Sequence, residues 1–176
     1  DIGVAPDGKL RMKHLLDTRI GDYHAMVPMA EVDTIGAGGG SIASIDSGGM
    51  FRVGPRSAGA VPGPACYGNG GTEPTSTDAM VVMGWLDADS FLSGSMDIDP
   101  ALARDVVQQI ADRLDSDIEH AAMGIFSILA HSMTEAISLH SVRKGYDPRE
   151  FSLVAEGGAG PLFAWQIAEQ LGIPRV

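Results

Sequence analysis

The sequence is poor in three features, and each scarcity excludes a class of protein. It has a single cysteine, Cys66, so no disulfide can form within the chain and a cytoplasmic location is expected. Lysine and arginine number 12 against 23 aspartates and glutamates, a formal net charge of −11, which excludes the basic patch of a nucleic-acid binder. No apolar run approaches the roughly 18 residues that a membrane span needs. We therefore expect neither nucleic acid nor a membrane as partner.

The sequence does contain a large apolar fraction and many glycines. Hydrophobic residues make up 44% of the 176 positions, enough to bury the core of one domain or of a part of a larger one. The chain starts at Asp1 without a methionine, which predicts an internal fragment unless the N-terminus is processed. Because each glycine costs backbone entropy on folding, the segment "TIGAGGGSIASIDSGG" from Thr34 suggests that room is needed there for a ligand.

Residues 1–97 predict short strands and glycine-rich loops. The Pro-Asp-Gly signal in "VAPDGKL" predicts a first hairpin, and "SIASIDSGGMFRVG" (41–54) predicts a second. Residues 54–75 are rich in glycine, proline and alanine, so they can form neither a regular helix nor a central strand. Loops of this length are usually functional or disordered, and the small residues favour a functional loop.

Helices are predicted from residue 75 onward, and they dominate residues 98–150. Thr75 and Asp78 fit the capping pattern of a short helix, and Asp99 precedes a second helix that begins at Pro100. The apolar stripe of the second helix is Leu102, Val106, Ile110 and Leu114. A third, longer helix is predicted from a capping box of Ser116 and Glu119 to Gly145, with a core face of Ala122, Phe126, Leu129, Met133, Ala136, Ile137 and His140.

Residues 151–176 predict a strand, a glycine loop and a helix. Residues 151–155 form the strand, residues 157–161 the loop and residues 162–171 the helix, and "IPRV" at the end predicts the start of another strand. The order of elements along the chain predicts an α/β fold in which helices flank a mixed sheet.

Two glycine loops are candidates for binding. A strand, a glycine loop and a helix present backbone N–H groups to an anion, which makes Gly157, Gly158, Ala159 and Gly160 candidate phosphate ligands. No Lys-Ser/Thr pair follows as in a P-loop, and Phe163 stands where the third glycine of a dinucleotide fingerprint would be, so a tight turn is the alternative.

The loop of Gly38, Gly39, Gly40 and Ser41 is the second candidate, with a permissive hairpin or bulge as its alternative. Together the two loops suggest a nucleotide or substrate cleft lined by backbone. Arg56 follows the second hairpin and is a candidate anion ligand, unless it is an ordinary surface arginine.

Few side chains predict chemistry of their own. Asp1, Asp33, Asp46 and Asp78 are the candidate acids, and Asp78 could hold Mg²⁺ or simply cap its helix. His131 and Glu135 share a helix face, but no third metal ligand is evident. Cys66 has no nearby histidine as a base, which favours a small buried residue over a nucleophile.

The segments "TIGAGGGSIASIDSGG", "VGPRSAGAVPGPACYGNGGTEPTSTDA" and "GGAGPLFA" resemble the hydantoinase A / 5-oxoprolinase family, which also includes subunits of acetone and acetophenone carboxylases. The resemblance covers essentially the whole chain. It implies a two-domain ATPase fold of the actin, sugar-kinase and heat-shock-chaperone type, with ATP and Mg²⁺ as cofactors. It also implies a second, hydantoinase B-like subunit and a cyclic amide substrate, hydantoin or 5-oxoproline, whose oxygen is phosphorylated before the ring opens. Carboxylase members activate a ketone in a related way.

The resemblance also assigns roles by position. Gly157 to Gly160 resemble the nucleotide-side loop, and Gly38 to Ser41 resemble part of the cleft floor. Asp1 resembles the catalytic acid that ends a Gly-Gly-Thr phosphate loop, which places this chain in the C-terminal half of the catalytic region and leaves it inactive alone. Members often have His where this chain has Phe163, so a non-catalytic nucleotide-binding or assembly module is the alternative function.

Overall fold

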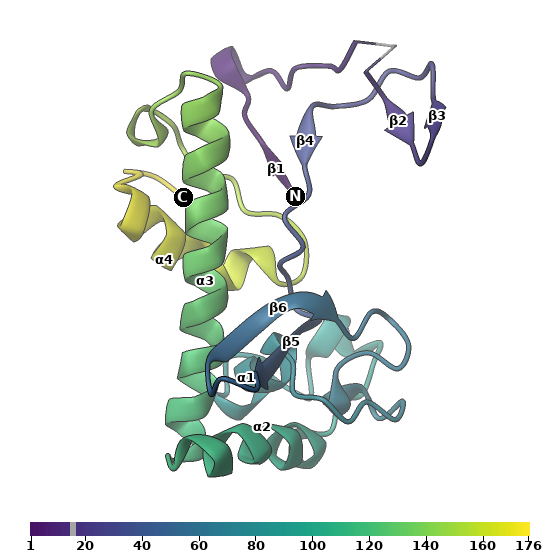
Figure 1. Ribbon diagram of the computed structural model, residues 1–176, viewed down its shortest axis with the longest axis vertical. Coiled ribbons are helices and arrows are strands. Elements are labelled where there is room, and N and C mark those ends of the chain that lie inside the picture. The colour runs from purple at the N-terminus through teal and green to yellow at the C-terminus, as the bar shows by residue number, and fades with distance from the viewer. Residues whose placement is uncertain (15–16) are drawn as a thin grey trace.

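A long helix forms the spine of the molecule in the computed structural model, which describes residues 1–14 and 17–176 (Figure 1). This helix, α3, spans Ile118–Arg143, and the helices α1 (Ser76–Val82), α2 (Pro100–Leu114) and α4 (Gly160–Leu171) all contact it. Helices α1 and α2 pack beside its first half together with a β-hairpin, whereas α4 lies beside its second half (Figure 1). The predicted helices are thus confirmed, and they enclose the core.

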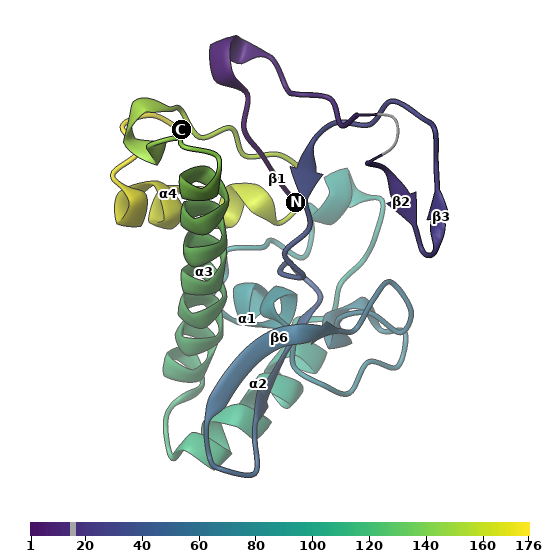
Figure 2. The ribbon, with the colours of Figure 1, turned by 45° about the horizontal axis from the view of Figure 1, so that its top comes forward.

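The strands form three separate two-stranded antiparallel sheets, so the single mixed sheet expected from the sequence is wrong for the described residues. The pairs are β1 (Ile2–Gly3) with β4 (Val32–Asp33), β2 (Arg19–Ile20) with β3 (Tyr23–His24), and β5 (Ser41–Ile45) with β6 (Phe51–Ser57). The turn at Pro6–Gly8 forms, but Gly3 pairs with Val32 and Met12 bridges Ala30, so the hairpin predicted around this turn is absent. The β2–β3 hairpin projects away from the helices in both views (Figure 2).

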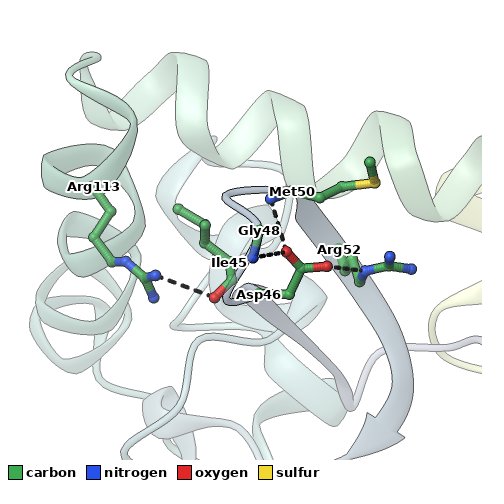
Figure 3. A network of polar contacts seen from close by, with 6 residues as sticks. All are labelled: Ile45, Asp46, Gly48, Met50, Arg52 and Arg113. Atoms are coloured by element: carbon green, nitrogen blue, oxygen red, sulfur yellow. Dashed lines mark hydrogen bonds and ion pairs between the residues drawn. The ribbon is translucent and has the colours of Figure 1, made fainter.

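The β5–β6 hairpin is confirmed, and the carboxylate of Asp46 closes its turn (Figure 3). This carboxylate accepts hydrogen bonds from two backbone amides of the turn at 2.9 and 3.0 Å, and from Arg52 Nε at 2.6 Å. The bond from Arg52, helped by the turn amides, lowers the pKa of Asp46. Arg113 of α2 donates to the carbonyl of Ile45 at 3.1 Å, which ties the hairpin to the helices. Asp46 therefore has a structural role.

Two details of the predicted helices need correction. Helix α3 is capped by Asp117, whose carboxylate accepts from the amide of His120 at 2.6 Å, so the capping box of Ser116 and Glu119 is wrong. A carboxylate can serve as the N-cap acceptor in place of a hydroxyl, which moves the helix start by one residue. Leu102 is 36% exposed, because α2 turns the small side chain of Ala103 toward its neighbours instead.

The C-terminal strands are absent from the described structure. Residues 151–155 and 173–176 have no regular secondary structure and are joined by one backbone bond, from Leu153 N–H to the Arg175 carbonyl at 2.9 Å. A strand exists only when a neighbour pairs with it, and a single bond makes no ladder. Helix α4 begins at Gly160 rather than at residue 162, so the loop and the helix are confirmed but the strand before them is wrong.

Aromatic side chains join α3 to α4 in the core. Phe126 of α3 stacks on Phe163 of α4 with centroids 4.7 Å apart and planes 10° apart, and Trp85 meets Phe126 edge-on, also at 4.7 Å. Both phenylalanines are fully buried. The predicted core face of α3 is confirmed at Ala122, Phe126, Leu129, Met133 and His140, whereas Ala136 and Ile137 are half-buried. Phe163 is therefore a packing residue.

Helix α3 is also long and apolar enough, by length and composition alone, to cross a membrane. Only 39% of its most apolar window is buried within the protein. Core helices pass the same test, and α3 packs against three other helices, so this feature is weak support for a membrane span.

Replacement of Phe126 by alanine tests the aromatic junction. We expect Phe126→Ala to lower the free energy of unfolding by about 3–5 kcal/mol, because the cavity removes contacts with both neighbouring rings. Leu139→Ala on the same helix is the control, since Leu139 is half exposed and its loss should cost less than about 0.5 kcal/mol. Equal effects in urea unfolding of the two variants would contradict the assignment.

Candidate functional site

The two glycine loops predicted to bind ligand lie against each other in the fold. A methyl group on Gly39 would come within 3.6 Å of the Ala159 side chain and within 2.7 Å of Thr77 Oγ1. A side chain at position 39 would displace the Thr77 hydroxyl, whereas its distance from Ala159 is an ordinary van der Waals contact, so the two loops lie in direct contact. We call the loop of residues 38–41 the floor loop and the loop of residues 157–160 the helix loop.

Helix α1 fixes the floor loop through its carbonyl groups. The Gly39 carbonyl accepts three hydrogen bonds at 2.9 Å, from the hydroxyls of Ser76 and Thr77 and from the Thr77 amide. The Ser76 hydroxyl also donates to the Gly38 carbonyl at 2.8 Å, and the Gly38 amide donates to Ser41 Oγ at 3.0 Å. Hydrogen bonds to the carbonyl oxygens of the floor loop thus fix its conformation, and none of them comes from a charged side chain.

The helix loop faces open space. A methyl group built on Gly157, Gly158 or Gly160 would meet nothing within 4 Å, and Gly157 has a φ of +81°, which favours glycine. No side chain caps the first turn of α4. Pro161 has no N–H group and the Leu162 amide donates to the Ala159 carbonyl at 3.1 Å, so the amides open to an anion are those of residues 157–160. Free amides and the positive end of the helix dipole together suit a phosphate or carboxylate group.

The carboxylate of Asp78 is buried beneath this site and is fully used by the protein. One oxygen accepts from the Thr75 amide at 2.9 Å, the Thr75 hydroxyl at 2.7 Å and the Ala65 amide at 3.2 Å. The other accepts from the Cys66 amide at 2.8 Å. Thr75 in turn accepts from the Asp78 amide, completing a capping box. Asp78 thus ties α1 to the loop of residues 54–75.

This geometry favours the capping role of Asp78 over a magnesium role. Its side chain has no exposed surface, and four donors already surround it. No group of three histidine, cysteine, aspartate or glutamate residues suited to a metal occurs in residues 1–14 and 17–176. His131 and Glu135 form only an exposed pair 3.5 Å apart.

Cys66 lies beside Asp78 and is fully buried. Burial raises the pKa of the Cys66 thiol, and the neighbouring Asp78 carboxylate raises it further. A nucleophilic cysteine needs a lowered pKa, so this thiol is a packing group.

Asp1 directly precedes β1, which pairs with β4, the strand that comes before the floor loop in the chain. The pairing of β1 with β4 places it beside Thr34, whose hydroxyl donates to the Asp1 carboxylate at 2.7 Å. Asp1 is exposed, so its second carboxylate oxygen is open to a ligand. Of the two candidate catalytic acids, Asp1 is the accessible one.

His140 makes a contact that the sequence did not predict. This buried side chain of α3 places its Nδ1 2.5 Å from the carboxylate of Asp33 on β4, and Lys144 pairs with Glu31 at 2.7 Å. The two residues of each pair are 107 and 113 positions apart in the sequence, so no local pattern predicts these contacts. These two contacts attach the N-terminal segment to α3, close to β1, which directly follows Asp1.

Arg56 is not a free anion ligand. Its guanidinium makes two hydrogen bonds with the carboxylate of Glu73, at 2.6 and 3.3 Å, and this pairing raises the pKa of Arg56. Both side chains are largely exposed at the edge of a groove beside the floor loop. The structure therefore brings the two glycine loops together, whereas Arg56 lies at the edge of the groove with its charge balanced by Glu73.

Replacement of Asp78 by asparagine tests its role as an anchor. We expect Asp78→Asn to lower the free energy of unfolding by about 2–3 kcal/mol, because an amide nitrogen would face buried N–H donors. Asp99→Asn is the matched control: Asp99 caps α2 from an exposed position, and asparagine caps equally well, so the change should stay within about 0.5 kcal/mol. A neutral effect of Asp78→Asn in thermal unfolding would argue against the anchor.

Comparisons with known proteins agree with this architecture. A family model described as hydantoinase/oxoprolinase matches residues 1–176. The alpha subunit of caprolactamase from Pseudomonas jessenii is 46% identical over 160 residues, which cover 88% of this chain and 23% of that protein. This chain therefore spans about a quarter of the length of that relative.

Two solved structures resemble the chain closely. A nucleotide-free structure of acetone carboxylase, from work on ATP-dependent acetone carboxylation, superposes with a TM-score of 0.80 at 30% identity, over 94% of this chain and 23% of that one. The ATP-dependent caprolactamase of Pseudomonas jessenii superposes with a TM-score of 0.76 at 47% identity, over 86% of this chain and 22% of that one. The match to the family model over residues 1–176 includes both glycine loops.

Proposed function

This chain belongs to the hydantoinase/oxoprolinase family, and from that premise we propose that it forms part of an ATP-dependent enzyme subunit that opens cyclic amides such as hydantoin or 5-oxoproline. The observation that carries the proposal is the meeting of the floor loop with the uncapped, open helix loop. Backbone amides in such an arrangement suit the phosphates of a nucleotide. The similarity to an ATP-dependent caprolactamase supports both the cofactor and the reaction class.

In the proposed reaction, the amide oxygen of the substrate would attack the γ-phosphorus of ATP, and ADP would leave. Water would then add to the activated carbon, the ring C–N bond would break and phosphate would depart. ATP would supply the phosphoryl group, and Mg²⁺ would offset the charge of its oxygens. The backbone amides of Gly157–Gly160, at the N-terminus of α4, would hold the phosphates in this scheme.

The remaining side chains divide into anchors and one accessible acid. Asp78 and Thr75 would keep the floor loop in place without touching the nucleotide. Asp1, exposed and oriented by Thr34, would be the carboxylate that approaches Mg²⁺ or the attacking water. Gly38–Ser41 would line the floor of the cleft, where the absence of side chains lets phosphate and substrate come close.

We also propose a two-domain ATPase fold of the actin and sugar-kinase type for the whole protein, a cytoplasmic location and a second, hydantoinase B-like subunit. The name of the most similar relative reported above, an alpha subunit, supports the presence of a partner. An ATP-dependent ketone carboxylase subunit is the second candidate function, and the close superposition with acetone carboxylase favours it. A non-catalytic nucleotide-binding module is the third.

The direct test is ATP hydrolysis by the full-length protein assembled with its partner subunit. At least one of caprolactam, hydantoin and 5-oxoproline should raise the rate about tenfold or more above the basal rate, because phosphoryl transfer awaits the acceptor oxygen. Stimulation by acetone with bicarbonate, and by no amide, would establish the carboxylase function instead. Nucleotide binding with no stimulation by either class would favour the non-catalytic module.

Gly158 separates nucleotide binding from folding. A valine there would meet nothing within 4 Å of its Cβ, so we expect Gly158→Val to leave the unfolding midpoint unchanged. Its branches would occupy the space of the phosphates, and the Kd for Mg·ADP should rise at least about tenfold, with a smaller rise in Gly158→Ala. An unchanged Kd in titration calorimetry with a folded Gly158→Val protein would remove the helix loop from the site.

A further inference from the structure

A groove of about 490 Å³ opens beside the floor loop. Its walls come from the β5–β6 hairpin and from both ends of the glycine- and proline-rich loop, including Ile42, Val61 and Pro62. The groove is continuous with the floor loop through the backbone: the Ala58 amide donates to the Gly40 carbonyl at 2.9 Å, and a methyl group on Gly40 would lie 2.8 Å from Ser57 Oγ. A molecule in this groove would therefore border the surface proposed to carry the nucleotide phosphates.

The lining of the groove is mixed: apolar side chains such as Ile42, Val61 and Pro62 alternate with the hydroxyls of Ser57 and Thr72 and with one ion pair. Arg56 and Glu73 are the charged residues of this lining, and their hydrogen bonds at 2.6 and 3.3 Å join them to each other. The charge of the rim thus sums to zero. Every donor that Arg56 directs at Glu73 is unavailable to an incoming anion, and the Glu73 carboxylate would repel one.

We propose that this groove receives the substrate ring and that the Arg56–Glu73 pair selects uncharged cyclic amides over those that carry a carboxylate. The inference rests on the proposed function and names the substrate class within it: simple lactams and hydantoins rather than 5-oxoproline. An uncharged ring would bury its apolar edge against Ile42, Val61 and Pro62. A carboxylate would lose water without gaining an unpaired cation in return, and that difference sets the preference.

A pair of matched substrates tests this selection. 2-Pyrrolidinone and 5-oxoproline share the same five-membered lactam ring and differ only in the carboxylate. In the full-length protein with its partner subunit, kcat/KM for 5-oxoproline divided by that for 2-pyrrolidinone defines a charge-preference ratio. Glu73→Gln frees Arg56, so this ratio should rise about threefold to tenfold. Arg56→Gln leaves Glu73 alone and should lower it.

Two further variants sharpen the result. The double variant Arg56→Gln/Glu73→Gln restores a rim of zero charge, so its ratio should return to within about twofold of the wild-type value. Arg52→Gln breaks the other exposed ion pair of β6, that with Asp46 at 2.6 Å, and serves as the control with an unchanged ratio. Arg56 and Glu73 are largely exposed, so these variants retain the fold.

Lactam turnover by the wild-type protein decides what an unchanged charge-preference ratio means. If lactams are turned over and the charge-preference ratio is the same in the wild type and in both single variants, Arg56 and Glu73 do not select the substrate. The proposed reaction would still stand. Absence of lactam turnover in the wild type contradicts the proposed reaction. Titration calorimetry with 5-oxoproline then tests the groove alone: a Kd at least about threefold lower in Glu73→Gln supports it, and an equal Kd overturns it.

Discussion

The buried carboxylate of Asp78 is the interaction on which the rest of the site depends. It accepts four hydrogen bonds, from Thr75 at the start of α1 and from the amides of Ala65 and Cys66 in the long loop. A buried carboxylate is stable only when donors satisfy it, so the first turn of α1 and the loop must stay together. That turn then carries the hydroxyls that hold the Gly39 carbonyl. The buried Asp78 carboxylate, which is not exposed to any ligand, thus fixes the position of the floor loop through α1.

The second half of the site depends on packing rather than on charge. Phe163 stacks on Phe126 of α3, which fixes the position of α4, and Ala159 at the start of that helix lies against Gly39 of the floor loop. The floor loop is bound through its carbonyl groups, whereas the helix loop is open and lacks a side-chain cap. An anion-binding surface can therefore form from backbone alone, and the low count of basic residues in the chain is compatible with a phosphate ligand.

Local rules predicted much of this fold. The capping box of α1, the start of α2 and the β5–β6 turn each depend on residues within a few positions of one another, and the sequence displays them directly. The strand at residues 151–155 and the hairpin around Pro6–Gly8 were wrong, because pairing depends on a distant neighbour. For the same reason the partner of Arg56 was not foreseen: Glu73 comes from the far end of the loop. The sequence suggests that the two glycine loops line one cleft, and the fold adds the contact itself, between Gly39 and Ala159.

Hydrogen–deuterium exchange of the full-length protein, with and without Mg·ADP, shows directly whether the two loops form one nucleotide-binding surface. We expect slower exchange in peptides that contain residues 38–41 and in those that contain residues 157–160, because both loops would contact the bound nucleotide or order around it. Slower exchange in the helix loop with an unchanged floor loop, or protection confined to segments elsewhere, would contradict a shared surface.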